Sequence, residues 1–219
     1  MPLWHEIQPR VLVGILHTEL TTLAWAFGLR NLILPPGSRI LPVAGMPYDM
    51  ARNSICMSTL DGGFDACFML DSDVIPPADA VLRLLRHQKP LISGIYHRRS
   101  PPHGVPVMMK GGQWVTSYPP NSVIEVDVVG AGCLLLSADF LRAMPPIQPN
   151  TGKHWFSWQS DLPRVKENEG WHMSEDFTMN KFVKEKMNIP ILIDTSVVCR
   201  HVGCAEANYG SLTPLNTVA

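Results

Sequence analysis

Two hydrophobic patterns alternate along the N-terminal half of the chain. Apolar runs of strand length predict buried strands at 11–16, 38–43, 66–71 and 91–95. The segments between them carry apolar residues at helical spacing, which predicts helices at 21–32, at 48–60 and from Pro77 onward. Strands that alternate with helices in this way indicate an α/β fold, with a mostly parallel, Rossmann-type sheet and helices on both faces.

The C-terminal half contains shorter apolar runs, which glycine and proline residues interrupt. These runs predict a smaller antiparallel or mixed β region at 105–110, 113–116, 124–129 and 132–136. Ser137 and Ser174 are suited to begin helices that reach 143 and 187, and the last strands are expected at 191–194 and 197–199. The segment 145–170 has no period, and we expect part of it to be a mobile lid.

The composition is that of a globular protein without a strong charge. The chain has 219 residues, of which 46% are hydrophobic, and a net charge of −1. This length suits a single domain, 1–219, and the near-neutral charge gives no global field that would attract nucleic acid or an acidic membrane. The five cysteines form no C-x-x-C pair. The longest apolar run is far shorter than the ~20 residues of a membrane span. We therefore expect a soluble, cytoplasmic protein with buried free thiols.

The predicted strand 66–71 ends in an acidic turn. Asp71, Ser72 and Asp73 follow its apolar residues directly and precede a Pro-Pro pair. Open α/β sheets bind ligands at the carboxyl ends of their strands, and two neighbouring carboxylates repel each other unless a positive charge lies between them. Oxygen ligands suit Mg²⁺ or Mn²⁺, so Asp71 and Asp73 predict one half of a metal site. An ordinary Asp-rich turn is the alternative interpretation.

Three further motifs follow this turn along the chain. They are Gly130-Ala131-Gly132 before a strand, Ser174-Glu175-Asp176 at a helix start and His201-Val202-Gly203 near the C-terminus. With Asp71-Ser72-Asp73, they occur in the order seen in nucleotide-sugar glycosyltransferases of the GT-A fold, and the sequence resembles this family, family 2 in particular. The resemblance covers most of the chain, from Val11 to Gly203.

The resemblance implies a donor site. Asp71, Asp73 and His201 would bind a Mn²⁺ or Mg²⁺ ion that bridges the donor diphosphate, and Asp71 would lie near the ribose or the metal. Arg52 and Gly132 would lie at the nucleotide-sugar site, with a UDP-sugar as the expected donor. A helix-surface arginine and a packed or surface histidine are the alternatives for Arg52 and His201.

The resemblance also implies an inverting transfer to an acceptor hydroxyl. Asp176 would remove the proton of that hydroxyl, and Glu175 would orient the acceptor or cap the helix. Ordinary carboxylates at a helix N-terminus are the alternative. The acceptor itself is left open: a carbohydrate, a protein, a small molecule or a modified nucleic-acid base.

Aromatic and basic residues outside the four motifs allow two interpretations each. The loop His97-Arg98-Arg99 could contact phosphates or an anionic acceptor, or it could be a solvated turn. Trp155 and Trp158 could stack on a sugar, or they could pin their long loop to the core.

Other functions share parts of this pattern. A D-x-D phosphohydrolase carries its motif on the first strand, whereas two βα units precede Asp71 here. The stretch from Gly14 to Glu19 lacks the G-x-G-x-x-G of a dinucleotide-dependent dehydrogenase and the Gly-rich, basic loop of a sugar-nucleotide pyrophosphorylase. A nucleotide- or sugar-binding module without turnover is the non-enzymatic alternative.

Overall fold

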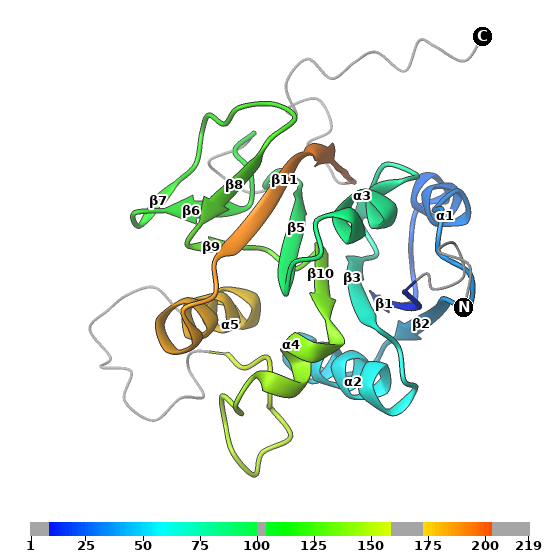
Figure 1. Ribbon diagram of the computed structural model, residues 1–219. Coiled ribbons are helices and arrows are strands. Elements are labelled where there is room, and N and C mark those ends of the chain that lie inside the picture. Colours follow the sequence, from blue (N-terminus) through cyan, green and yellow to red (C-terminus); the bar gives the residue numbers. More distant parts are fainter. Residues whose placement is uncertain (1–8, 100–103, 159–172, 203–219) are drawn as a thin grey trace, which may run out of the picture.

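The computed structural model describes residues 9–99, 104–158 and 173–202, and its centre is a seven-stranded sheet (Figure 1). In the order in which they lie side by side, the strands are β2 (Arg39–Val43), β1 (Val11–Leu16), β3 (Ala66–Asp71), β10 (Cys133–Ser137), β5 (Leu91–Ile95), β11 (Ile191–Val198) and β8 (Val123–Val126). All except β10 and β8 run in the same direction. The carboxyl ends of five strands therefore meet at one edge.

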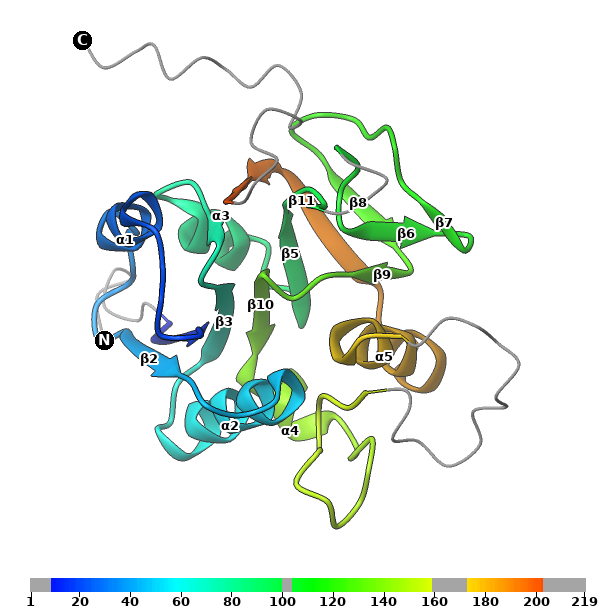
Figure 2. The same ribbon diagram turned by 180° about the vertical axis from the view of Figure 1, so that it is seen from behind.

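Helices cover both faces of this sheet (Figures 1 and 2). The helices are α1 (Leu23–Arg30) and α3 (Ala80–Arg86) on one face, and α2 (Tyr48–Asp61), α4 (Ala138–Ala143) and α5 (Glu175–Phe182) on the other, with α5 continuing as the π-helical segment η2 (Val183–Met187). Within the described ranges, no helix has the length and apolar character needed to cross a membrane.

Strand β3 shows why the central strands are apolar throughout. Cys67 and Met69 lie in the core on the α2 side, and Phe68 and Leu70 lie in the core on the α1 side. All four side chains are completely buried. A strand covered by helices on both faces needs apolar residues at every position, so its sequence is a continuous run and not an alternation.

Two small sheets complete the fold. Strand β6 (Met108–Lys110) lies between β7 (Gln113–Trp114) and β9 (Val128–Val129) in an antiparallel sheet. Strand β12 (Arg200–His201) pairs with β4 (Val74–Ile75), so that His201 lies opposite Val74. The backbone N–H of Val202 also donates to the carbonyl of Asp73 at 2.6 Å. This pairing brings His201 to the acidic turn.

The expected fold class is confirmed: a mostly parallel, GT-A-like α/β sheet flanked by helices, with a smaller mixed β region. The strands that form the smaller region differ from those predicted. The run 132–136 forms β10 inside the central sheet, because residues 133–136 are at most 3% exposed and need cover on both faces. The run 124–129 is split between β8 of the central sheet and β9 of the small one. The two strands expected at 191–194 and 197–199 are the single strand β11.

The first part of the segment predicted to contain a lid is fixed to α2. Asn53 Oδ1 accepts hydrogen bonds from the backbone N–H groups of Trp155 at 2.8 Å and Phe156 at 3.2 Å, and its Nδ2 donates to the carbonyl of Phe156 at 2.7 Å. Lys153 Nζ forms an ion pair with Oδ2 of the buried Asp49 at 2.9 Å. The remainder of the predicted lid, from 159 to 170, lies outside the described residues.

Candidate functional site

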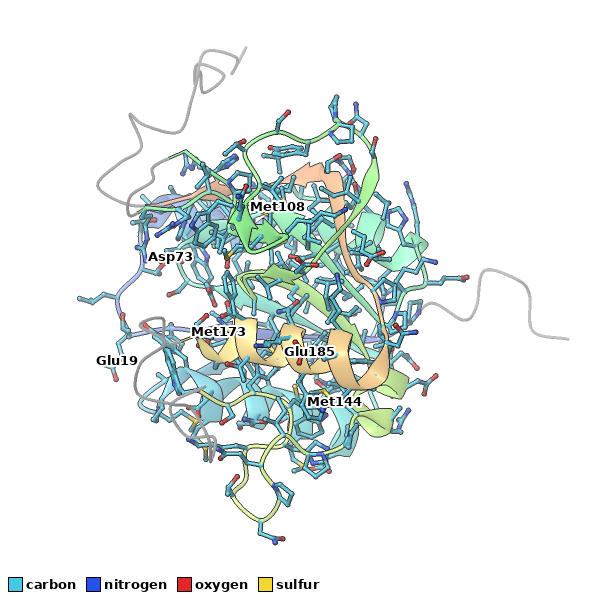
Figure 3. The ribbon with its side chains drawn as sticks, turned by 90° about the vertical axis from the view of Figure 1, so that its left-hand side faces the viewer. Glu19, Asp73, Met108, Met144, Met173 and Glu185 are labelled. Carbon is cyan, nitrogen blue, oxygen red and sulfur yellow. The ribbon has the colours of Figure 1, made fainter. Side chains whose placement is uncertain are left out.

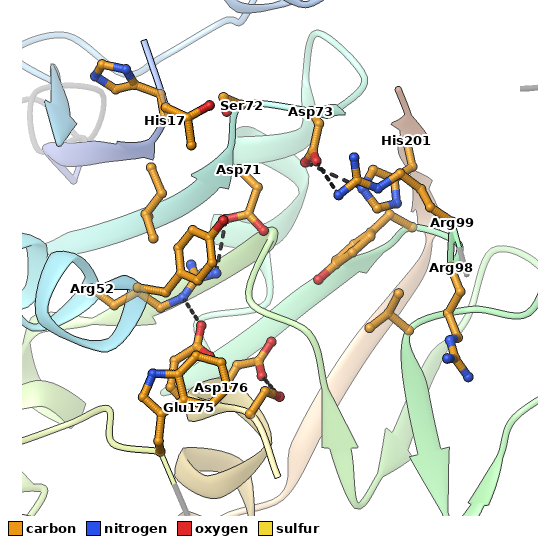
Figure 4. A pocket seen from close by; sticks show the side chains of 17 residues that line it. His17, Arg52, Asp71, Ser72, Asp73, Arg98, Arg99, Glu175, Asp176 and His201 are labelled. Atoms are coloured by element: carbon orange, nitrogen blue, oxygen red, sulfur yellow. Dashed lines mark hydrogen bonds and ion pairs between the residues drawn. The ribbon is translucent and has the colours of Figure 1, made fainter. Parts of the chain in front are cut away.

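A cavity of about 570 Å³ lies at the carboxyl ends of the central strands, where open α/β sheets bind ligands (Figure 4). Its walls come from the end of β1, the turn after β3, the segment 96–99, the start of α5 and β12. Figure 3 shows Asp73 and Met173 toward the same edge of the molecule, with Glu185 farther along the helix. Of the residues predicted for the donor and acceptor sites, Gly132 does not line the cavity, and the following do: Arg52, Asp71, Asp73, Glu175, Asp176 and His201.

Asp73 and His201 face each other on one wall of the cavity. His201 Nε2 lies 3.4 Å from Asp73 Oδ1, and its Nδ1 lies 2.6 Å from the carbonyl oxygen of His97. A carbonyl only accepts, so Nδ1 donates this hydrogen bond and Nε2 is the nitrogen that a neutral ring would offer as a ligand. Arg99 Nη2 lies 2.9 Å from the other oxygen of Asp73. Burial acts to raise the pKa of Asp73, but His201 and Arg99 outweigh burial and lower it.

The pair fits a divalent cation as part of a ligand set. A carboxylate oxygen and an imidazole nitrogen whose second nitrogen is held by a carbonyl are suitable ligands for Mn²⁺. Across the described ranges, no group of three or more His, Cys, Asp or Glu side chains is placed to hold a metal ion. Asp71, the third predicted ligand, pairs through Oδ1 with Arg52 at 3.0 Å. A cation at Asp73 and His201 would therefore need further ligands from outside these side chains.

Arg52 is buried between the two acidic motifs. Its Nη2 donates to Asp71 Oδ1 and its Nε donates to Glu175 Oε1, both at 3.0 Å, and Nη1 donates to the carbonyl of Ala131 at 3.3 Å. Burial alone would lower the pKa of Arg52, but the neighbouring carboxylates outweigh it and raise the pKa. With 3% exposure, Arg52 is not the helix-surface arginine of the alternative interpretation. It joins the end of β3 to the start of α5.

Glu175 is buried, unlike an ordinary carboxylate at a helix N-terminus. It is 4% exposed, and burial, followed by repulsion from Asp176, raises its pKa from 4.5 to about 7 in spite of Arg52. Burial also raises the pKa of Asp71, again against the effect of Arg52. Burial therefore favours the protonated form of Glu175 to a higher pH than in an exposed glutamate.

Asp176 is held firmly in one orientation. Its Oδ2 accepts from the N–H of Ala131 at 3.0 Å, and its Oδ1 accepts from the N–H of Phe177 at 2.8 Å and from the hydroxyl of Ser174. The residue is 9% exposed and lines the cavity. Asp176 thus connects the Gly130–Gly132 segment to the start of α5.

The Gly130-Ala131-Gly132 segment passes close to Tyr96 and Asp71, with no room for a side chain at Gly130 and little at Gly132. A Cβ at Gly130 would lie 2.0 Å from Tyr96 Oη, and a Cβ at Gly132 would lie 3.0 Å from Asp71 Oδ2. The N–H of Gly132 donates to Tyr96 Oη at 3.2 Å. Gly132 therefore packs directly against Asp71, behind the residues that line the cavity.

Of the aromatic and basic candidates outside the four motifs, Trp155 lies in the core, whereas Trp158, Arg98 and Arg99 line the cavity. Trp155 is buried and its Nε1 donates to the carbonyl of Leu141 at 2.9 Å, so it pins its loop to the core. Trp158 lines the cavity. Arg98 and Arg99 also line it, and the Arg98 guanidinium lies 4.1 Å from the centre of the Trp114 ring.

Tyr96 and Trp25 are among the residues around the site that the sequence analysis did not identify. Tyr96 lines the cavity, and Trp25 Nε1 donates to the carbonyl of Asp71 at 3.0 Å, which holds the acidic turn. Tyr96 directly follows the apolar run of β5, in the same way that Asp71 ends the run of β3. That position at a strand end is the signal that could have identified it.

A second cavity of about 480 Å³ adjoins the first at the ends of β1 and β2. The two cavities share Leu16, His17, Thr18 and Tyr48. Most other residues of the second cavity are apolar or glycine, among them Val43. A ligand with a charged part and a less polar part could therefore extend through both.

Comparisons with known proteins establish the fold and no further property. No protein-family model matches the chain, and no curated protein matches it significantly. The structure is similar to the crystal structure of A197 from STIV, with a TM-score of 0.59 and 14% identity over 89% of this chain and 86% of that one. A glycosyltransferase involved in the glycosylation of the major capsid of PBCV-1 matches with a TM-score of 0.34 and 13% identity over 61% of this chain and 63% of that one, too low a score to support an argument.

Proposed function

We propose that the chain is a metal-dependent glycosyltransferase that moves a sugar from a nucleotide-diphosphate donor to an acceptor hydroxyl. The observation that carries this proposal is the pairing of two half-sites in one cavity. Asp73 and His201 lie on one wall, the buried Glu175 and Asp176 lie on another, and Arg52 joins the second half-site to Asp71 beside the first.

The donor would bind on the Asp73 side. Asp73 and His201 would hold Mn²⁺ or Mg²⁺ together with diphosphate oxygens, and the cation would offset the charge that develops on the leaving nucleoside diphosphate. The nucleoside would occupy the adjoining cavity at the ends of β1 and β2, which has the less polar walls that a base and ribose need. A UDP-sugar is the donor we propose to test first.

The acceptor would bind on the side of α5. Asp176 would remove the proton of its hydroxyl, since three hydrogen bonds hold this carboxylate in a fixed orientation. Glu175 lies beside it, accepts a hydrogen bond from Arg52, and would orient the acceptor. Attack from the face of the sugar opposite the diphosphate would invert the anomeric centre.

The test combines binding with turnover. Thermal unfolding would be followed with UDP-, GDP- and other nucleotide sugars, with and without Mn²⁺, and the stabilising donors would then be incubated to detect slow release of the nucleoside diphosphate. Cation-dependent stabilisation that Asp73→Asn removes, together with release, supports a glycosyltransferase. Stabilisation without release indicates a binding module. Phosphate release from phosphomonoesters, with no response to nucleotide sugars, would favour the phosphohydrolase instead.

A further inference from the structure

The carboxylate of Asp73 already faces a positively charged side chain. Arg99 Nη2 lies 2.9 Å from Oδ2, while His201 Nε2 lies 3.4 Å from Oδ1 (Figure 4). The guanidinium of Arg99 thus occupies one of the two oxygens that a divalent cation would use. A guanidinium and a divalent cation repel each other, so the presence of one beside this carboxylate weakens the binding of the other.

We infer that Arg99 is a resident counter-ion of the cation site, which leaves Asp73 when cation and diphosphate bind and then contacts the diphosphate. The inference rests on the proposed function and adds one role to it: Arg99 pairs first with the carboxylate of Asp73 and then with the diphosphate. A guanidinium is suited to both, because its fork of N–H groups matches carboxylate and phosphate oxygens alike.

The surroundings of Arg99 permit this exchange. Its side chain is 50% exposed and that of Asp73 is 30% exposed, so their ion pair is screened by water and contributes little to stability. The backbone before it is held in place, since the N–H of Arg98 donates to the carbonyl of Val105 at 2.9 Å. The neighbouring Arg98 differs, because its guanidinium lies over the ring of Trp114. Arg99 is therefore the arginine of the pair that can change partners while its backbone stays beside the cavity.

If Arg99 exchanges partners, one substitution should change the affinities for Mn²⁺ and for UDP in opposite directions. In Arg99→Gln, Mn²⁺ alone should bind roughly threefold to tenfold more tightly, because a competing positive charge a few ångströms away is removed. UDP in the presence of saturating Mn²⁺ should bind roughly tenfold more weakly, because a charge-assisted contact to the diphosphate is lost. Calorimetry measures both affinities without any need for turnover. Arg99→Lys should keep the weak binding of Mn²⁺ alone and lose part of the affinity for UDP.

The matched control is Arg142→Gln. Arg142, whose side chain is about as exposed as that of Arg99, forms an ion pair with Asp139 at 2.8 Å and does not line the cavity. This variant should change neither affinity. If Arg99→Gln weakens both Mn²⁺ and UDP, or changes neither, the exchange of partners is refuted while the cation site stands. If the unaltered protein does not bind Mn²⁺ even with UDP present, the proposed cation site fails, and the inference fails with it.

Discussion

Replacing Glu175 with glutamine should change how the stability of the protein depends on pH. The pKa of Glu175 is raised from 4.5 to about 7, first by burial and then by Asp176. The folded protein therefore holds this proton more tightly than the unfolded chain does. It follows that the free energy of unfolding contributed by this group is highest below pH 4.5 and falls as the pH rises through about 7. Glutamine has no such proton, so Glu175→Gln should remove this fall.

The size of the effect follows from the same pKa. A difference of one pKa unit corresponds to about 1.4 kcal/mol, so a pKa raised from 4.5 to about 7 corresponds to on the order of 3 kcal/mol of lost stability. Glutamine has nearly the same shape and keeps an oxygen that can accept from Arg52 Nε. The variant should therefore gain stability relative to the unaltered protein as the pH rises, by up to that amount.

Urea unfolding of both proteins at several values between about pH 5 and about pH 8 measures this difference, and groups common to both cancel in the comparison. Glu185→Gln, a change at an exposed position of η2, is the control and should show no such trend. A stability difference that is flat across this range, or one that favours the unaltered protein increasingly as the pH rises, would show that the ion pair with Arg52 outweighs the cost of burial. The assignment of a raised pKa would then be wrong.

Three further predictions concern single residues of the fold and the site. Asn53→Ala should lower the free energy of unfolding, measured by urea unfolding, by about 2–4 kcal/mol, because the N–H groups of Trp155 and Phe156 lose their acceptor. Gly130→Ala should lower it by ~1–3 kcal/mol, because the new Cβ would lie 2.0 Å from Tyr96 Oη; unchanged thermal unfolding would contradict this contact. Asp176→Asn should lower sugar transfer by about 10²–10⁴-fold while Mn²⁺-dependent binding of UDP persists, and a product that retains the anomeric configuration of the donor would rule out its role as base.

The strands that the sequence predicted best are those buried on both faces. Strands β1 and β5 have the predicted ends, because each is an apolar run whose every residue is buried. The run at 132–136 has the same appearance, yet its place between β3 and β5, and its direction, depend on partners far away in the sequence. Local pattern identifies such a strand and leaves its neighbours undetermined.

In the site, too, residues marked by their neighbours in the sequence could be predicted, and residues defined by distant partners could not. Asp71 and Asp73 were found because they end an apolar run, which is a local feature. The burial of Arg52 was not foreseen, since a lone arginine in a predicted helix ordinarily faces solvent, and its partner Glu175 lies 123 residues away. The contacts of Asn53 with the loop at 155–156 have a similar separation and were missed for the same reason.

The charges around the cavity give a physical reason for donor and cation to bind together. Among the residues that the structure describes, its lining contains four carboxylates, from Asp71, Asp73, Glu175 and Asp176, and three arginines, Arg52, Arg98 and Arg99. Proton uptake by Glu175 near pH 7 brings these groups close to balance. A diphosphate would add about two to three negative charges to a site whose described side chains carry no excess positive charge to receive them. A divalent cation bound at Asp73 would supply that charge, and Arg99, once released from Asp73, would supply one more contact. Nucleoside diphosphate alone should therefore bind weakly and the cation alone should bind weakly, whereas each should strengthen the binding of the other by the same factor.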